Sequence, residues 1–288
     1  MLTGSRQIMA TLVSITLLAT VTACSSSSAA ANAGDSSAPL AHLVPKTIME
    51  KGTVSVATTA FNAPFESLQN GEIVGFDVDM ANDVGRRLGL KFKFVNTAFD
   101  GIVPAIQGGR FDLAISEIYD TPARAKIVDL IDYAKDGSIL TVPKGNPMVI
   151  KTPEDLCGHT VAVITGSAEA ASLAALQKEC VGTQITTRSF PELTSALSAL
   201  ISGRSDVLYG PGAGSAVAVA KSGGGLETLG TLTESHFVGI VVPKSEAQFR
   251  DAIMSALKAM IEDGSYAKLL AKYNIKVAGL SQITLNGK

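Results

Sequence analysis

The sequence predicts an α/β fold divided into two lobes. The composition is that of a folded protein, since 46% of the residues are hydrophobic and glycine is abundant. Short β-rich runs alternate with segments of helical periodicity, which is typical of sheets flanked by helices. A chain of 288 residues can bury more than one compact core. The net charge of −2 lacks the basic excess of nucleic-acid-binding proteins.

Residues 1–23 are predicted to be a secretion signal. Arg6 provides a basic start, and the apolar run 8–20 is shorter than the roughly 20 residues that a membrane-spanning helix needs. The run ends in Val-Thr-Ala-Cys, which resembles a lipobox, so we expect cleavage before Cys24 and a lipid on this cysteine. The alternative is an ordinary signal peptide with an incidental cysteine. Residues 24–42 are rich in Ser and Ala, lack periodicity, and are predicted to be a flexible tether.

The two other cysteines are expected to form a disulfide. A secreted protein folds in an oxidising compartment, where Cys157 and Cys180 can pair. Cys157 follows a predicted turn, and Cys180 follows an Ala-rich helical segment, 168–179. We expect no metal site and no cofactor, because the cysteines show no ligand spacing with the three histidines His42, His159 and His236.

The folded part is predicted to begin near Leu43, and the first alternating, β-rich run follows. Residues 53–58 are expected to form the first strand. A helix is expected to follow, with Asp77 as its N-cap and Gly89 at its end, because apolar residues recur between them at helical spacing. Residues 91–95 are expected to form the next strand.

The stretch 101–133 contains the main candidate for a ligand-binding group. Its pattern predicts a helical segment closed by Gly108 and Gly109, a strand over 111–115 and a polar loop over 116–121. Thr121 is a good N-cap and Pro122 suits the first helical position, so Arg124 lies in the first turn of a helix. A cation opposes the helix dipole there, which suggests that an external anion binds. The alternative is a surface ion pair with Asp120 or Asp129.

The second half of the chain repeats the strand-and-helix pattern. Strands are expected over 137–142, 160–164, 184–187, 207–209 and 237–242, with the terminal helices in 249–274. Gly166 and Ser167 form a turn before the helix that starts at Ala168, a combination that favours anions. A further helix is expected over 189–202, with its apolar side chains turned inward at Leu193, Leu197, Leu200 and Ile201.

Several short motifs resemble those of one known family. They are Gly75-Phe76-Asp77-Val78-Asp79, Gly109-Arg110-Phe111-Asp112, Thr121-Pro122-Ala123-Arg124, Leu130-Ile131-Asp132-Tyr133 and Gly203-Arg204-Ser205-Asp206. With them, nearly the whole chain after the tether resembles the family 3 solute-binding proteins of bacterial ABC importers, the polar amino-acid type. The resemblance implies a type II periplasmic-binding-protein-like fold. Lobe 1 would comprise 43–136 and 237–288, and lobe 2 would comprise 137–236, with a hinge where the chain crosses twice, near 135–138 and 235–238.

The resemblance also implies a site for the carboxylate of an amino acid. Its expected members are Arg124, Ser116, Ser167 and Gly166, with an aromatic ring over the ligand from Phe61 or Phe65. Either phenylalanine could instead belong to the core. One hydroxyl that is usual in the family is missing, because Ala168 stands in its place.

The ammonium half of the expected site departs from the family. Many amino-acid binders carry an Asp where this chain has Pro211. We expect Glu117 to supply the missing negative charge and Tyr119 to add a ring for packing or for a cation–π contact. The alternative is that Glu117 is solvated or pairs with Arg124.

The resemblance implies a binding protein and not an enzyme. Its ligand would be a small carboxylate-bearing nitrogenous solute, an amino acid or a derivative, captured by hinge closure and passed to an ABC permease. The protein would be a monomer, secreted and held to the membrane only by its lipid. It would lie in the periplasm of a diderm host or on the outer face of the membrane of a monoderm host. The alternative is an enzyme similar to the cyclohexadienyl dehydratases, with Glu117 as general acid. The tether favours the binding protein, because an importer component gains from staying near the membrane.

Overall fold

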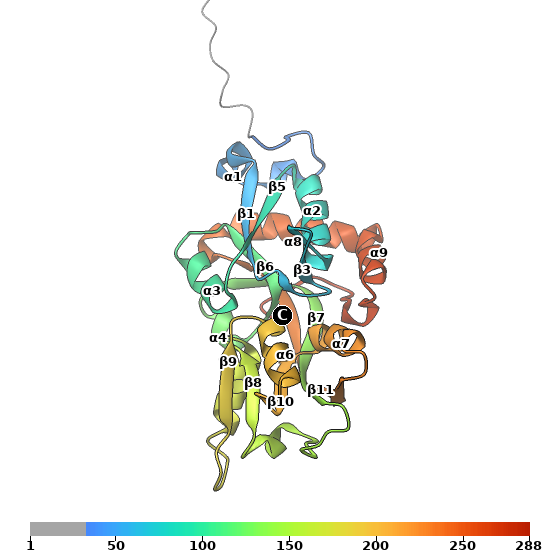
Figure 1. Ribbon diagram of the computed structural model, residues 1–288. Helices are drawn as coiled ribbons and strands as arrows, with labels where there is room; N and C mark the ends of the chain where they lie inside the picture. The colour runs from blue at the N-terminus through green and yellow to red at the C-terminus, as the bar shows by residue number, and fades with distance from the viewer. Residues whose placement is uncertain (1–32) are drawn as a thin grey trace, which may run out of the picture. The chain divides into compact units, whose positions relative to one another are not determined.

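A computed structural model describes residues 33–288 (Figure 1). The predicted signal segment, Cys24 and most of the predicted tether lie outside the described residues. Within residues 33–288, no helix combines the length and the apolar character needed to cross a membrane.

One part of the fold, at the top of Figure 1, contains the elements before residue 126 and after residue 243. The elements before residue 126 are η1 (Ala41–Leu43), α1 (Lys46–Lys51), β1 (Thr53–Thr58), β2 (Phe61–Asn62), β3 (Glu66–Gln69), β4 (Glu72–Val74), α2 (Phe76–Leu88), β5 (Lys91–Asn96), α3 (Phe99–Gln107), β6 (Leu113–Tyr119) and α4 (Pro122–Ala125). Those after residue 243 are η3 (Lys244–Glu246), α8 (Ala247–Glu262), α9 (Ser265–Lys272), η4 (Lys276–Ala278) and β12 (Thr284–Leu285).

The other part, at the bottom of Figure 1, is built from the intervening elements. These are η2 (Pro153–Leu156), β8 (Thr160–Ile164), α5 (Ala168–Leu176), β9 (Thr186–Phe190), α6 (Leu193–Ile201), β10 (Val207–Pro211) and α7 (Gly212–Lys221). The two parts are joined by the two longest strands, β7 (Asp129–Pro143) and β11 (Leu226–Val242). The fold is therefore α/β with two lobes and two crossings, as predicted.

The nine strands of the main sheet follow the order β5-β1-β6-β11-β7-β10-β8-β9, with β12 beside β7. Strands β5, β1 and β6 are parallel, and so are β10, β8 and β9. The antiparallel pair β7–β11 lies between these two sets and changes register between Leu229 and Glu234. Each lobe thus has its own parallel strands, and the long pair belongs to both.

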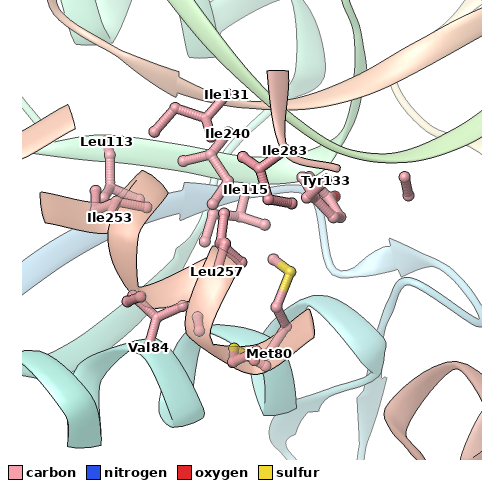
Figure 2. Close-up of a cluster of buried hydrophobic side chains, with 14 of the residues drawn as sticks. Met80, Val84, Leu113, Ile115, Ile131, Tyr133, Ile240, Ile253, Leu257 and Ile283 are labelled. Carbon is pink, nitrogen blue, oxygen red and sulfur yellow. The ribbon is translucent and has the colours of Figure 1, made fainter. Parts of the chain in front are cut away.

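Each lobe has its own hydrophobic core. Figure 2 shows side chains of the first core, where α2, β6 and α8 contribute Met80, Val84, Leu113, Ile115, Ile253 and Leu257. A separate core of the second lobe contains Leu140, Val142, Leu156, Val161, Val163, Leu173 and Val207. The first core also touches lobe 2, since Ala168 and Ala213 pack against it.

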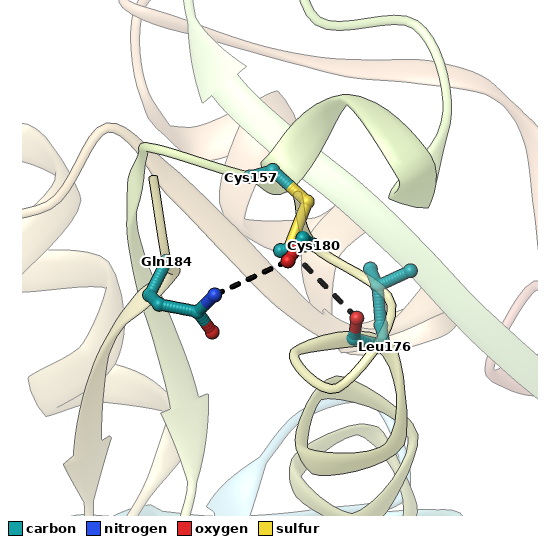
Figure 3. The surroundings of a disulfide bond; sticks show 4 residues. All are labelled: Cys157, Leu176, Cys180 and Gln184. Atoms are coloured by element: carbon teal, nitrogen blue, oxygen red, sulfur yellow. Dashed lines mark hydrogen bonds between the residues drawn. A yellow bond between two sulfur atoms is a disulfide. The ribbon is translucent and has the colours of Figure 1, made fainter. Parts of the chain in front are cut away.

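The predicted disulfide between Cys157 and Cys180 is present, with the two Cα atoms 5.7 Å apart (Figure 3). It links the end of η2 to the segment after α5, and the Gln184 side chain donates a hydrogen bond to the Cys180 carbonyl oxygen at 3.2 Å. Helix α5 ends at Leu176, three residues earlier than expected.

Three predictions about local structure were wrong. Residues 116–119 are not a loop but the end of β6, where backbone pairing with β11 continues to Tyr119. The helix expected from 189 begins at Leu193, because 186–190 pair with β8 as strand β9. Ile201 was expected to turn inward but is 69% exposed, because the buried face of α6 is the one that carries Leu193 and Leu200.

Asp77 does not cap α2, contrary to expectation. The helix starts at Phe76, whose N–H donates to the Pro64 carbonyl oxygen, and the Asp77 N–H donates to the Phe65 carbonyl oxygen. These two carbonyl oxygens accept the first N–H groups of the helix, so no side-chain cap is needed and the Asp77 side chain can turn inward. It is fully buried beneath the cleft described next.

Candidate ligand-binding site

A small cleft with a cavity volume of about 40 Å³ lies between the lobes. It is bordered by the carboxyl ends of strands from both lobes, the place where open α/β sheets bind ligands. The lobe 1 side includes Thr59, Phe61, Ser116, Glu117, Tyr119 and Arg124, and the lobe 2 side includes Ser167, Glu169, Pro191, Leu193 and Pro211.

Arg124 presents its guanidinium group to this cleft. Thr121 caps the short helix α4 by accepting the Arg124 N–H at 3.3 Å, as the sequence predicts. The guanidinium donates to the carbonyl oxygens of Tyr119 at 2.7 Å and of Gly166 at 3.1 Å. It also lies 5.4 Å from the centre of the Phe99 ring.

No carboxylate of the described residues forms an ion pair with Arg124. The expected alternative partner Asp129 instead pairs with Lys244 at 3.1 Å and with Arg250 at 2.7 Å. Burial lowers the pKa of the Arg124 guanidinium, although arginine remains protonated in proteins. A charged group with only carbonyl partners is suited to bind an anion that enters the cleft.

Gly166 brings the two lobes into contact beside Arg124. Its φ of +75° is unfavourable for residues with a Cβ, and such an atom would lie 3.0 Å from Cβ and 3.1 Å from Cα of Asp100 in lobe 1. The next residue, Ser167, caps α5 by accepting the Ala170 N–H at 3.1 Å. The predicted turn is therefore present, and glycine fits it for conformational and steric reasons.

Ser116 reaches the cleft, but its hydroxyl already has partners. It donates to Oε1 of Glu66 at 2.8 Å and accepts the Thr59 N–H at 3.0 Å. The Thr59 hydroxyl donates to the same oxygen of Glu66 at 2.9 Å. Glu66 was not predicted as a site residue. It is completely buried, and its Oε2 has no partner within the described part of the chain.

Glu117 is buried at the floor of the cleft and does not pair with Arg124. The Asn62 amide donates to its Oε2, while its Oε1 has no partner among residues 33–288. Its backbone N–H donates to Oδ2 of Asp77 at 3.2 Å. Burial, followed by the nearby Asp136 carboxylate, raises the pKa of Glu117 well above its ordinary value. The alternative that Glu117 is solvated or pairs with Arg124 is thus wrong.

A pair of adjacent carboxylates, Asp77 and Glu66, lies beneath Glu117. Asp77 accepts the Tyr133 hydroxyl at 2.7 Å and lies next to Glu66. Burial raises the pKa of Asp77 to about 6. Burial, followed by the adjacent Asp77 carboxylate, raises the pKa of Glu66 well above its ordinary value. This side of the cleft is therefore acidic and carries unsatisfied oxygen acceptors.

The two candidate phenylalanines differ in position. Phe61 borders the cleft, whereas Phe65 is completely buried and packs edge-to-face on Phe76, with ring centres 5.9 Å apart. The prediction that Phe65 contacts the ligand is wrong, because its ring belongs to the lobe 1 core. Phe99, which the sequence analysis did not select, supplies the ring beside Arg124.

The model of the bacterial extracellular solute-binding proteins, family 3, matches residues 54–276. The chain belongs to this family. It is 28% identical over 249 residues to the arginine-binding protein ArgT of Corynebacterium glutamicum, a match that covers 85% of this chain and 81% of the relative.

Two solved structures extend the likeness. An ancestral arginine-binding protein bound to arginine is 33% identical, with a TM-score of 0.73 over 77% of this chain and 98% of that one. An ancestral amino-acid-binding protein described as a precursor of cyclohexadienyl dehydratase is 32% identical, with a TM-score of 0.70 over 79% of this chain and 97% of that one. This family 3 protein therefore has relatives that are named for binding and one that is linked to an enzyme.

Lobe 2 of this family 3 protein contributes two carboxylates to the cleft lining that were not predicted, Glu169 and Glu192. Pro211 borders the cleft and precedes α7, so no charge is present at that position. Glu169, in the first turn of α5, also borders the cleft and accepts the Ser138 hydroxyl at 2.9 Å. Burial raises its pKa. Acidic residues are common in the first turn of a helix, so nothing in the sequence indicated that Glu169 borders the cleft.

The cleft offers no evident metal centre. Within residues 33–288, no group of three or more His, Cys, Asp and Glu side chains is arranged to hold a metal ion. Carboxylate oxygens of Glu66 and Glu117 that lack a partner among these residues can accept hydrogen bonds, which suits a ligand bearing N–H groups.

Proposed function

We propose that this family 3 protein captures an amino acid between its lobes through the ligand carboxylate and Arg124, and delivers it to an ABC permease. The observation that carries the proposal is the Arg124 guanidinium, which faces the cleft and, among residues 33–288, donates hydrogen bonds only to the Tyr119 and Gly166 carbonyl oxygens. A carboxylate would complete a charge-assisted, two-pronged contact there. The family supports the transport role.

Binding would close two lobes with the boundaries expected from the sequence, 43–136 with 237–288 for lobe 1 and 137–236 for lobe 2. The crossings at 135–138 and 235–238 would form the hinge, and their strands pair directly in the long β7–β11 ladder. A ligand that touches both lobes shifts the hinge equilibrium by its difference in affinity for the closed and open forms.

The ligand would carry a cation as well as a carboxylate, and a basic amino acid fits best. Oε1 of Glu117 and Oε2 of Glu66 are buried and have no hydrogen-bond partner among the described residues. Tyr119 and Phe61 supply rings that can pack on the ligand. The names of the relatives agree, since ArgT and the ancestral protein are described as arginine-binding.

The cellular setting follows from segments outside the described residues. We propose that residues 1–23 are removed, that Cys24 carries a lipid and that residues 24–42 tether a monomer at the outer face of the cytoplasmic membrane. Mass spectrometry of the protein from the membrane fraction would test this through a lipid-modified N-terminal Cys24, and an unmodified residue there would contradict it.

The second candidate is an enzyme of the dehydratase type. The buried Glu117 with its raised pKa and the likeness to a dehydratase precursor favour it. A general acid of that kind would consume the ligand. Recovery of unchanged compound after prolonged incubation supports the binding protein, and formation of a dehydrated product supports the enzyme.

The ligand class can be tested with matched pairs of compounds. L-arginine and L-citrulline have similar shapes, but only arginine carries a side-chain cation. L-arginine at about 100 times its dissociation constant should add roughly 2.7 kcal/mol to the free energy of unfolding, a shift of several degrees in melting temperature. Citrulline should shift it less. Equal shifts would contradict cation recognition, and no shift with any amino acid would contradict the proposed class.

A further inference from the structure

Tyr119 lies at the end of the cleft where both crossings between the lobes pass. Its hydroxyl is 3.2 Å from Oδ2 of Asp136 and 3.1 Å from the Gly137 carbonyl oxygen, both on β7. Its ring stacks on His236 of β11, with centres 4.7 Å apart and an interplanar angle of 20°. Asp136 and His236 are register partners in the β7–β11 ladder. One side chain of lobe 1 is thus held by both crossings.

Asp136 also contacts lobe 2. The same Oδ2 accepts the Ala213 N–H at 3.0 Å, in the first turn of the ten-residue helix α7. The approach is close, because a Cβ on Gly212 would lie 2.9 Å from the other oxygen, Oδ1. The helix dipole favours a carboxylate at this end. Asp136 therefore bridges the Tyr119 hydroxyl of lobe 1 and the backbone of α7 in lobe 2.

We propose that Tyr119 and Asp136 form a latch that favours the closed arrangement of the lobes. Turning lobe 2 about the crossings moves Ala213 relative to Tyr119, so one carboxylate oxygen cannot keep both partners in an open arrangement. The Ala213 N–H donates to Asp136 at 3.0 Å, and the single proton of the Tyr119 hydroxyl is shared between Asp136 and the Gly137 carbonyl oxygen. Tyr119 and Asp136 thus act as positioning residues for closure.

The latch links closure to the ligand because Tyr119 also borders the cleft. Apparent affinity depends on the fraction of molecules that are competent to bind, so a latch that raises the closed fraction tightens binding. His236 supports the ring and is itself held by Glu234, with Nε2 and Oε2 3.1 Å apart. This link to the ligand rests on the proposed function, whereas the latch itself can be tested without a ligand.

Tyr119→Phe tests the latch because it keeps the stacked ring and removes only the hydroxyl. Small-angle scattering of the purified, ligand-free protein should show a larger radius of gyration for this variant than for the wild type. Saturating L-arginine should restore the compact curve, with a dissociation constant weakened about fivefold, as expected for one net hydrogen bond. Unchanged scattering of the ligand-free variant would overturn the proposal.

Tyr266→Phe is the matched control. Its hydroxyl donates to the Tyr133 carbonyl oxygen at 2.5 Å within lobe 1, so its loss should lower the melting temperature without opening the lobes. Expansion of this control equal to that of Tyr119→Phe would also overturn the latch, since it would reflect general loosening.

Asp136→Ala is the second variant, for use if Tyr119→Phe does not fold. It removes the shared acceptor and should expand the ligand-free protein, and wild-type scattering in this variant would refute the latch. If L-arginine leaves both melting and scattering of the wild type unchanged, the proposed ligand class is wrong. The comparison of ligand-free variants still decides the latch in that case.

Discussion

Gly166→Ala is predicted to weaken ligand binding more than it weakens the fold. The glycine has a φ of +75°, and forcing an L-residue into this left-handed region costs about 1–2 kcal/mol. The new methyl group would also meet Asp100 of lobe 1 at 3.0–3.1 Å, and one of these neighbours is the main-chain Cα, which cannot rotate away. The strain acts on the fold of lobe 2, whereas the steric contact acts only when the lobes are together.

The two contributions can be separated with Gly182→Ala. Gly182 has a φ of +85°, and a Cβ there would have no neighbour within 4 Å. Both variants should lose a similar free energy of unfolding and melt about 2–4 °C lower for each kcal/mol. Only Gly166→Ala should raise the dissociation constant for L-arginine, by about five- to tenfold for a closure penalty of about 1–1.4 kcal/mol.

Thermal denaturation and isothermal titration calorimetry measure the two quantities on the same samples. Unchanged affinity in Gly166→Ala would show that the loop does not touch Asp100 in the bound form. Equal losses of affinity in both variants would show that strain anywhere in lobe 2 is enough, and would refute the steric argument.

Three further predictions concern charge and covalent structure. Glu117→Gln should reduce the preference for L-arginine over L-citrulline. It should also reduce the gain in arginine affinity with rising pH, because the raised pKa keeps the wild-type Glu117 protonated at low pH. Equal weakening of the binding of both ligands would indicate a structural role. Asp120 has a pKa of about 6, raised by burial and then by Asp132. Its ordinary value is near 4, so the folded state holds the proton longer, and stability present at low pH is lost as pH rises towards 6. The melting temperature of Asp120→Asn, relative to that of the wild type, should therefore be higher at pH 7.5 than at pH 4. A difference that does not change with pH would contradict this. Replacing Cys157 and Cys180 together by serine should lower the free energy of unfolding by about 3 kcal/mol and leave affinity intact, whereas a matching loss of affinity would show that the bond shapes the cleft.

The features predicted best from the sequence are those decided by neighbouring residues. Thr121 and Pro122 start α4 as expected, because capping and ring geometry act within one turn. Gly89 ends α2 in the left-handed conformation for the same reason. Arg124 then enters the cleft because a helix start follows a strand end. The cysteines pair as expected in an oxidising compartment, although the sequence could not show where the helix before Cys180 ends.

The features that were missed depend on contacts between distant segments. Glu66, Asp77 and Glu117 meet beneath the cleft only because β3, α2 and β6 pack together. Glu117 was predicted as a site residue, whereas Glu66 and Asp77 look like ordinary polar residues in their own segments. Phe61 and Phe65 flank the same short turn, and only packing on Phe76 assigns the second to the core.

The end of β6 illustrates how tertiary contacts override a local pattern. Ser116 and Glu117 are polar and predict a loop, yet both are buried because Glu66 and Asn62 supply hydrogen-bond partners. Backbone pairing of Ile118 and Tyr119 with β11 then completes the strand. A polar run next to a binding site is therefore a poor indicator of a loop.

The most direct test of the central claim is calorimetric titration of Arg124→Ala and Arg124→Lys with L-arginine and with L-argininamide, which lacks the carboxylate. If Arg124 anchors the carboxylate, the wild type should prefer arginine strongly. Arg124→Ala should lose about 3–5 kcal/mol of arginine binding and most of that preference. The arginine affinity of Arg124→Lys should lie between those of the wild type and Arg124→Ala, since lysine keeps the charge without the two-pronged geometry. Arginine binding of undiminished affinity in Arg124→Ala would contradict the account.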